Sequence, residues 1–115
     1  MKPPKIRNYN KGPEDIIQQD LIRLLKLKEW FVKETHGNMY SSGWPDLYAC
    51  KRRYGPRWIE VKNPVNYKFQ PSQIEDFHKW TAEGIGIWIL VAATEHEYDK
   101  LFRAPNWHHY LSVFK

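Results

Sequence analysis

The hydrophobic and polar positions along the chain predict helices that alternate with short strands. Apolar residues recur every three or four positions between Glu14 and Leu27, with charged or amide side chains between them, which is the pattern of a helix with one buried face. Gly12-Pro13 followed by two acids is a typical helix start, because proline suits the first turn and early acids complement the helix dipole. We therefore predict a helix over about Glu14–Leu27. Its apolar stripe consists of Ile17, Leu21, Leu24 and Leu25.

Three short segments downstream have the composition of strands. Trp30–Thr35, Asp46–Lys51 and Arg57–Lys62 are rich in β-branched or aromatic residues, and Gly, Ser, Asn and Pro separate them. We predict three strands, of which the last two form a hairpin that turns over Arg52–Pro56.

The following segment predicts a second helix. Ser72 and Glu75 have the spacing of a capping box, apolar residues follow at helical spacing, and Gly84 marks the end. We expect this helix over about Gln73–Glu83.

The last part of the chain predicts one more strand and one more helix. Ile85–Ala92 is apolar at odd and even positions alike, which is typical of a strand buried on both faces in the middle of a sheet. A capping box at Thr94 and Glu97 predicts a helix that ends before Pro105. The predicted order is α-β-β-β-α-β-α. This order indicates an α/β fold (an α+β mixed sheet flanked by helices) in a single domain over residues 14–115.

Composition and charge narrow the class of protein. A chain of 115 residues suits one small domain, and its 42% hydrophobic and 16% aromatic residues exclude disorder. The net charge of +5 is typical of a protein that binds a polyanion. The single cysteine, Cys50, excludes intrachain disulfides and cysteine-based zinc fingers and suits a reducing compartment.

Two features bear on location. The longest uncharged apolar run, Gly84–Thr94, is far shorter than the roughly 20 residues of a membrane helix, so we expect no contact with a membrane. Residues 1–13 carry four positive charges and no acid, and no apolar stretch follows them. We expect a flexible basic arm on an intracellular protein without a signal peptide.

Two short motifs carry the candidate chemistry. Pro45-Asp46 begins the second predicted strand, and Glu60-Val61-Lys62 ends the third. Because strand side chains alternate, Glu60 and Lys62 share one face, and the hairpin register brings Asp46 beside Glu60. Two carboxylates this close repel each other unless a cation lies between them, and hard oxygen ligands select Mg²⁺ or Mn²⁺.

Such an arrangement suits phosphate chemistry. A bound cation lowers the pKa of its water and neutralises charge on a phosphate, while Lys62 orients the water and faces the developing charge. The alternative is that Glu60 and Lys62 form an ion pair on a solvated strand face.

In this order of elements the two motifs resemble the PD-(D/E)xK nuclease superfamily. Within that superfamily the chain is most similar to the VRR-NUC group, and the resemblance covers about Glu14–Ala92. It is carried by Glu14 and Gln18 on the first helix, by Gly43-Trp44-Pro45-Asp46 and Ile59-Glu60-Val61-Lys62, and by Gln73 before the second helix. The resemblance implies a restriction-endonuclease-like core.

The same resemblance implies roles for individual residues. Asp46 and Glu60 would bind the metal, the Val61 carbonyl would add a ligand, and Lys62 would be catalytic. Glu14 would be an outer or additional carboxylate, and Gln73 a polar group lining the site. Asp15 competes with Glu14 for its position, and Gln70 competes with Gln73.

Basic and aromatic residues near these motifs are candidates for DNA contact, together with Lys11 of the arm. Four cations at the hairpin tip suit phosphates, although exposed turns commonly have this composition. They are Lys51, Arg52, Arg53 and Arg57. In the Thr35–Trp44 loop, His36 could touch a phosphate and Trp44 could stack on a base. A loop histidine is more often solvated, and a tryptophan is more often packed.

These features together predict a Mg²⁺-dependent endonuclease that hydrolyses DNA phosphodiester bonds. The resemblance implies a small homodimer that cuts branched DNA such as four-way (Holliday) junctions. The same superfamily includes phage-type homing endonucleases, which cut specific sites, so site-specific cutting is an alternative. A module that binds nucleic acid without cutting is another alternative, and the intact Asp46, Glu60 and Lys62 argue against it.

The apolar aromatic residues of the C-terminus are a candidate dimer contact, or they pack on their own core. They are Trp107, Tyr110, Leu111, Val113 and Phe114.

Overall fold

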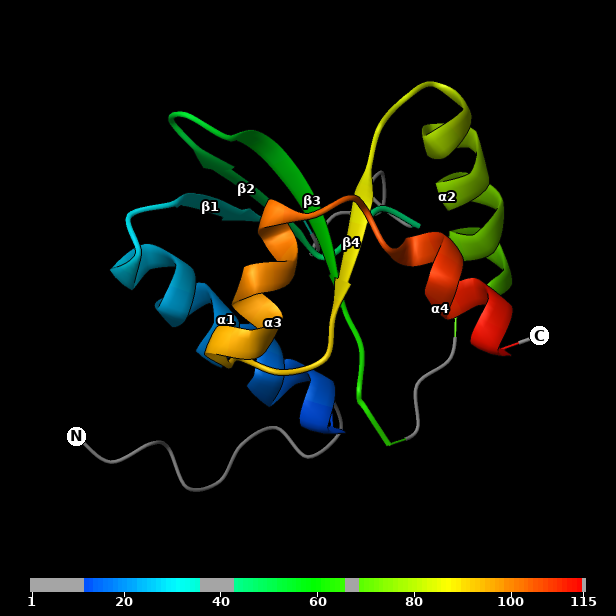
Figure 1. Ribbon diagram of the computed structural model, residues 1–115. Helices are drawn as coiled ribbons and strands as arrows, with labels where there is room; N and C mark the ends of the chain where they lie inside the picture. Colours follow the sequence, from blue (N-terminus) through cyan, green and yellow to red (C-terminus); the bar gives the residue numbers. More distant parts are fainter. Residues whose placement is uncertain (1–11, 36–42, 66–68, 115) are drawn as a thin grey trace.

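A four-stranded sheet with helices on both faces forms the protein in the computed structural model (Figure 1). The structure describes residues 12–35, 43–65 and 69–114, with the backbone alone at 12, 13 and 111–114. The elements are α1 (Gly12–Leu27), β1 (Phe31–Glu34), β2 (Leu47–Lys51), β3 (Gly55–Val61), α2 (Pro71–Ala82), β4 (Ile87–Leu90), α3 (Glu95–Asp99), the 3₁₀ helix η2 (Lys100–Phe102) and α4 (Trp107–Phe114).

The sheet has the order β1-β2-β3-β4. β1 pairs antiparallel with β2, and β2 pairs antiparallel with β3 in the predicted hairpin. β4 returns parallel to β3 after the crossover through α2, which is the connection that parallel neighbours require. The predicted order of elements is confirmed as far as α3, and one further helix, α4, follows it.

Two hydrophobic clusters hold the helices to the sheet. On one face, Leu21 and Leu25 of α1 pack against alternate residues of the strands and against Leu101 of η2. On the other face, Phe77 of α2 and Trp107 of α4 pack against β4. Figure 1 shows α1 and α3 together on one side of the sheet and α2 and α4 together on the other. The buried stripe predicted for the first helix is confirmed.

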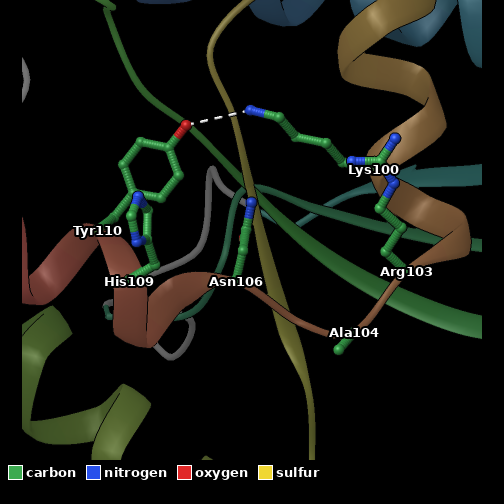
Figure 2. A pocket seen from close by; sticks show the side chains of 6 residues that line it. All are labelled: Lys100, Arg103, Ala104, Asn106, His109 and Tyr110. Atoms are coloured by element: carbon green, nitrogen blue, oxygen red, sulfur yellow. Dashed lines mark hydrogen bonds between the residues drawn. The ribbon is translucent and has the colours of Figure 1, made fainter.

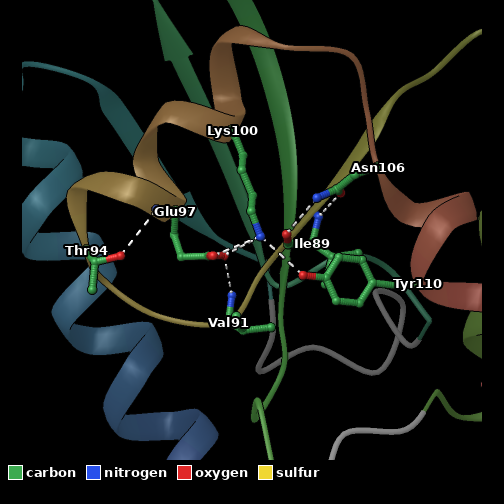
Figure 3. A network of polar contacts seen from close by, with 7 residues as sticks. All are labelled: Ile89, Val91, Thr94, Glu97, Lys100, Asn106 and Tyr110. Atoms are coloured by element: carbon green, nitrogen blue, oxygen red, sulfur yellow. Dashed lines mark hydrogen bonds and ion pairs between the residues drawn. The ribbon is translucent and has the colours of Figure 1, made fainter. Parts of the chain in front are cut away.

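The position of β4 differs from the prediction. All four of its residues are buried, as the apolar run indicated, but β4 lies at an edge of the sheet and not in its middle. The chain after η2 covers this edge, and Asn106 exchanges two hydrogen bonds with the backbone of Ile89, at 2.6 and 3.1 Å (Figure 3). Glu97 accepts the N–H of Val91 at 3.0 Å. Side chains thus satisfy the outer backbone groups that another strand would satisfy in a wider sheet.

The helix starts were predicted in part. The capping box of α2 is formed by Gln70 and Gln73, not by Ser72 and Glu75, because the helix begins two residues earlier, at Pro71. At α3 the Thr94 hydroxyl accepts the Glu97 N–H as predicted. The Glu97 carboxylate does not complete that box, since it is bound to Val91 and to Lys100.

α4 was absent from the prediction, although Trp107 begins an apolar pattern at helical spacing. The Trp107 side chain is 1% exposed and packs edge-to-face on Phe77, and Tyr110 packs against the same cluster. Two of the aromatic residues that were candidates for a dimer contact therefore belong to the core of their own chain. The side chains of Leu111, Val113 and Phe114 lie outside the described part.

Among the described residues, none of the helices is both long and apolar enough to traverse a bilayer.

Candidate active site

The register of the β2–β3 hairpin brings the two predicted carboxylates together. Leu47 pairs with Ile59, so the preceding residue on one strand, Asp46, lies opposite the following residue on the other, Glu60. Asp46 Oδ2 accepts the backbone N–H of Val61 at 2.8 Å. This bond continues the hairpin by one step and fixes the Asp46 carboxylate at the end of β3.

The turn before Asp46 is fixed by its neighbours on both sides. Gly43 has φ +87°, and a Cβ at this position would collide with the carboxylate of Asp76 on α2. On the other side, the backbone N–H of Thr35 donates to the Asp46 carbonyl at 3.0 Å. Glycine is favoured here because the turn needs a left-handed backbone, which residues with a side chain rarely adopt.

Glu60, Lys62 and Gln73 form a buried polar group beside Asp46. Their side chains come from β3, from the residue after it and from the first turn of α2. The Lys62 ammonium lies 3.3 Å from Glu60 Oε2 and donates to Gln73 Oε1 at 3.1 Å. The Gln73 amide nitrogen donates to Glu60 Oε2 at 2.7 Å. All three residues are less than 10% exposed, which excludes the alternative of an ion pair on a solvated strand face.

The first turn of α2 orients Gln73. Its Oε1 also accepts the backbone N–H of Gln70 at 3.1 Å, so the same side chain caps the helix and contacts both charged residues. Gln73 faces the carboxylates, while Gln70 is exposed and serves as the N-cap. Of the two glutamines that the sequence left as alternatives, Gln73 is the one whose side chain lies against Glu60 and Lys62.

The electrostatics of Glu60 fit a bound cation. The pKa of Glu60 is raised from 4.5 to about 8, first by burial and then by the charge of Asp46, while Lys62 and the bond from Gln73 act in the opposite direction. Its Oε1 is buried and has no hydrogen-bond partner among the described residues. A divalent cation between Glu60 and Asp46 would satisfy this oxygen and relieve the repulsion that raises the pKa.

The described residues contain no group of three or more His, Cys, Asp or Glu side chains placed to share a metal ion. Glu14 is therefore not gathered with Asp46 and Glu60 into one cluster. Its carboxylate instead accepts the backbone N–H of Asn63 at 3.0 Å, one residue beyond Lys62. That bond places Glu14, the first acid of α1, beside the end of β3.

One contact of the site was not found from the sequence. The Lys62 ammonium lies 4.5 Å from the centre of the Phe69 ring, and Phe69 is buried. This cation–π contact helps to hold the ammonium in place. Phe69 lies in the link between β3 and α2, where no periodic pattern marks it.

The predicted DNA-contacting residues are placed differently from one another. Lys51 donates to the Lys28 carbonyl at 2.6 Å. Arg57 donates to the Leu101 carbonyl at 2.7 Å and lies over the Trp88 ring. Both cations thus hold the hairpin to its neighbours, whereas Arg52 and Arg53 are exposed at the turn.

The exposed turn lies far from the carboxylates. β3 is seven residues long, and at ~3.3 Å per residue this separates the turn from Glu60 by roughly 20 Å. Trp44, by contrast, lies next to the site, where it packs edge-to-face on Trp58 and Trp80 and remains 39% exposed. Lys11 and His36 lie outside the described residues.

A separate hollow of about 250 Å³ lies outside the edge of β4, between η2 and α4 (Figure 2). Three of its polar side chains are engaged with one another or with neighbouring groups. Lys100 is bound to Glu97 and to the Tyr110 hydroxyl, and Asn106 is bound to Ile89. The hollow belongs to the covering of the β4 edge and contains no part of the carboxylate site. It is lined by Lys100, Arg103, Ala104, Asn106, His109 and Tyr110.

Comparison with known proteins gives one informative likeness. No family model matches the sequence, and no curated protein matches it. A solved structure described as a VRR_NUC domain superposes with a TM-score of 0.61 at 20% sequence identity, over 78% of this chain and 95% of that one. The chain has the fold of a VRR_NUC domain. The fold that the sequence motifs predicted is thereby confirmed, and the carboxylate site lies within this VRR_NUC fold.

Proposed function

We propose that the protein is a metal-dependent nuclease that hydrolyses DNA phosphodiester bonds, with Mg²⁺, or Mn²⁺ in its place, held by Asp46 and Glu60. The observation that carries the proposal is the buried Glu60 Oε1, which has no hydrogen-bond partner among the described residues although Asp46 lies opposite. A buried carboxylate oxygen without a partner is costly unless a cation binds there. The VRR_NUC fold supports the same function.

The residues of the site have distinct roles in this proposal. The Val61 carbonyl would add an oxygen ligand, while Glu14, which is not gathered with Asp46 and Glu60 in the structure, would act as an outer carboxylate. When bound, the cation supplies an acidic water and positive charge near the scissile phosphate. Lys62 presents a fixed ammonium to the charge that develops on the phosphate, and its burial strengthens that effect. Gln73 keeps Lys62 and Glu60 at their spacing and so positions both.

The charge of the site suits a phosphodiester. Without a cation the two carboxylates and one ammonium give the site no net positive charge: it is near neutral while Glu60 holds its proton and negative above the Glu60 pKa of about 8. One divalent cation would give the site a positive charge that attracts a phosphate. Metal binding would therefore be needed for productive binding of the scissile bond as well as for the chemistry.

The substrate we propose is branched DNA, cut by a homodimer. A small domain covers part of a branched substrate, and two-fold symmetry would place two sites on strands of opposite polarity. Site-specific cutting of the homing type, and binding without cutting, are the competing functions.

One experiment separates these functions. The full chain is incubated with labelled duplex, flap and four-way-junction DNA in Mg²⁺ or in EDTA. Cleavage of the junction or flap, present in Mg²⁺ and absent in EDTA, supports the proposal. Cleavage of one duplex sequence alone would favour a site-specific endonuclease of the homing type. Binding of DNA without any cleavage would indicate a module that binds nucleic acid and does not cut it.

The control for this experiment is the variant Glu60→Gln, which keeps the size of the side chain and removes its charge. It is expected to bind junction DNA and to leave it uncut. A Glu60→Gln variant that cuts at the wild-type rate in Mg²⁺ would show that the activity comes from elsewhere, such as a contaminating nuclease.

A further inference from the structure

Five aromatic side chains line the sheet on the face that carries the candidate site. Tyr48 lies two residues after Asp46, and Trp58 lies two residues before Glu60, so strand alternation places both rings on the side of the carboxylates. Phe31 of β1 pairs with Cys50 and therefore faces the same way as Tyr48. We refer to these residues as the aromatic strip: Phe31, Tyr48, Trp58, Trp80 and Trp44.

The rings of the aromatic strip contact one another in sequence across the strands. Phe31 lies 6.4 Å from Tyr48, and Tyr48 lies 4.9 Å from Trp58, between ring centroids. Trp58 lies 5.0 Å from Trp80 of α2, and Trp44 contacts both tryptophans, at 6.1 and 5.8 Å. The strip thus runs without a break from β1 to Trp44, two residues before Asp46.

The aromatic strip is open at both ends. Phe31 is 56% exposed and Trp44 is 39% exposed, while the rings between them are half-buried. α2 and α4 lie over β3 and β4 on this side, and no helix of the described residues covers β1 and β2 there (Figure 1). Contiguous exposed aromatic surface of this kind is uncommon on a protein without a partner for it.

The charges around the strip are those of a surface for a polyanion. Lys33 is exposed and pairs with Tyr48 across the strands, and the exposed Arg52 and Arg53 lie beyond the Phe31 end. The acid of β1, Glu34, points to the opposite face, where Gln18 donates to it. The carboxylates near the Trp44 end are those of the candidate site and that of Asp76 on α2, which lies beside Gly43, so the cationic part of this face is the β1 end.

From these observations we infer that the aromatic strip binds the unpaired bases of a nucleic-acid strand whose backbone passes the carboxylate site. Flat rings stack on base faces, which are accessible where bases are unpaired and hidden within a duplex. The inference deepens the proposed function and rests on it for the position of the scissile phosphate. It identifies the recognised feature of a branched substrate as a short single-stranded segment next to the cut.

The test measures binding in EDTA, where no cleavage is expected. The probes are a fluorescein-labelled oligothymidylate of about 12 nucleotides, a length within the range that one small domain covers, and a blunt duplex of the same length. Fluorescence anisotropy gives the affinity of the full chain for each probe. The wild-type protein is expected to bind the single strand more tightly than the duplex.

Two substitutions replace a flat ring with a smaller apolar side chain. Phe31→Leu and Trp44→Leu are each expected to weaken binding of the single strand about fivefold or more, the scale of one lost stacking contact, and to change duplex binding less than twofold. The matched control is Phe102→Leu, because Phe102 is similarly exposed, at 41%, and packs with Trp30 and Tyr98 in the cluster on the opposite face. The control is expected to bind both probes like the wild type.

Phe31 is more than half exposed, so Phe31→Leu is expected to fold normally, and a thermal melt checks this. Equal wild-type affinity for single strand and duplex would overturn the inference, as would wild-type affinity of Phe31→Leu for the single strand. Light scattering tests whether a second copy of the chain, and not a nucleic acid, occupies this surface. If Phe31→Leu converts a dimer into a monomer and leaves binding of the single strand unchanged, the strip is an interface between two copies, and the inference is wrong.

The proposed nuclease function and the inference about the aromatic strip are tested by different assays, so each can be refuted separately. If the wild type cuts junction DNA in Mg²⁺ and the strip variants bind oligothymidylate normally, the strip inference alone is wrong. If no substrate is cut and Phe31→Leu still weakens binding of the single strand, the nuclease proposal alone is wrong.

Discussion

The amide nitrogen of Gln73 donates to Oε2 of Glu60 over 2.7 Å. With Oε2 occupied in this way and by Lys62, the other oxygen of Glu60 is the one available to a cation. Gln73 therefore determines which oxygen of Glu60 would be presented to the proposed metal ion, and it does so from the first turn of a helix that it also caps. This relationship connects the start of α2 to the chemistry on β3.

Replacing Gln73 tests its positioning role. Gln73→Met keeps the length of the side chain and removes its hydrogen bonds to Glu60, to Lys62 and to the Gln70 N–H. The kcat for junction cleavage is therefore expected to fall about 10- to 100-fold, as for loss of a partner that orients a metal ligand. KM is expected to change little. The matched control is Gln70→Met, which removes the other half of the capping box. It should lower the melting temperature and leave kcat within about threefold of the wild type.

The two carboxylates are predicted to be required for metal binding and dispensable for folding. Asp46→Asn and Glu60→Gln remove the charges that hold the cation, and each should reduce cleavage on the order of 10³-fold. Calorimetric titration with Mn²⁺ should show the loss of metal binding directly. Binding of DNA in EDTA should be equal or tighter, because Asp46→Asn removes a negative charge near the phosphate and Glu60→Gln removes one above the Glu60 pKa of about 8. Weaker DNA binding by these variants would contradict the assignment.

Lys62 is predicted to act in the chemical step. Lys62→Met should lower the cleavage rate about 100-fold or more, the scale of losing one preorganised catalytic group, and keep measurable Mn²⁺ binding. Lys79→Met serves as the control, since Lys79 lies exposed on α2 and its loss should not alter the rate. Loss of metal binding in Lys62→Met would show instead that the lysine acts by holding Glu60.

The raised pKa of Glu60 predicts how the metal-free protein responds to pH. Because the pKa is about 8 in the folded chain and 4.5 ordinarily, the folded state binds more protons than the unfolded state between these values. Stability in EDTA should therefore fall as pH rises from about 4.5 to about 8. The Glu60→Gln variant should lack this pH-dependent contribution to the free energy of unfolding. The difference between the unfolding free energies of wild type and variant, measured in urea at each pH, therefore isolates it. A difference that is constant with pH would refute the prediction.

The hairpin cations are predicted to divide into two kinds. Arg52→Ala with Arg53→Ala should weaken DNA binding and lower the slope of log affinity against log salt by about 2, with no change in melting temperature. Arg57→Ala should do the reverse and lower the melting temperature, because Arg57 bonds to the Leu101 carbonyl and lies over Trp88. Equal effects of the two changes on DNA binding would mean that the tethered arginine also contacts phosphate.

The candidate site was largely predictable because it depends on local rules. Alternation along β3 places Glu60 and Lys62 on one face, and the short turn after Lys51 determines which residue lies opposite Glu60. These rules need no knowledge of the rest of the chain. The same holds for the apolar stripe of α1, whose spacing was visible in the sequence.

What the sequence did not reveal depends on distant contacts. β4 is as apolar as a central strand because α3 and the segment around Asn106 cover it, and nothing in Ile87–Leu90 itself indicates that the cover is made of side chains. Lys51 and Arg57 have the composition of a phosphate-binding turn, and their carbonyl partners come from residues 23 and 44 positions away. α4 could have been predicted from the sequence, since Trp107 and Tyr110 already have helical spacing.

The covered edge of β4 limits how this sheet could join another chain. A strand from a second protein could add there only after displacing the two hydrogen bonds of Asn106 and the bond from Val91 to Glu97, each worth about 1 kcal/mol net. At the opposite edge, β1 presents the charged pair Lys33 and Glu34, residues of the type that discourage unintended strand addition. Extension of the sheet by β-augmentation is thus opposed at both ends, so partners are expected to engage its faces and loops.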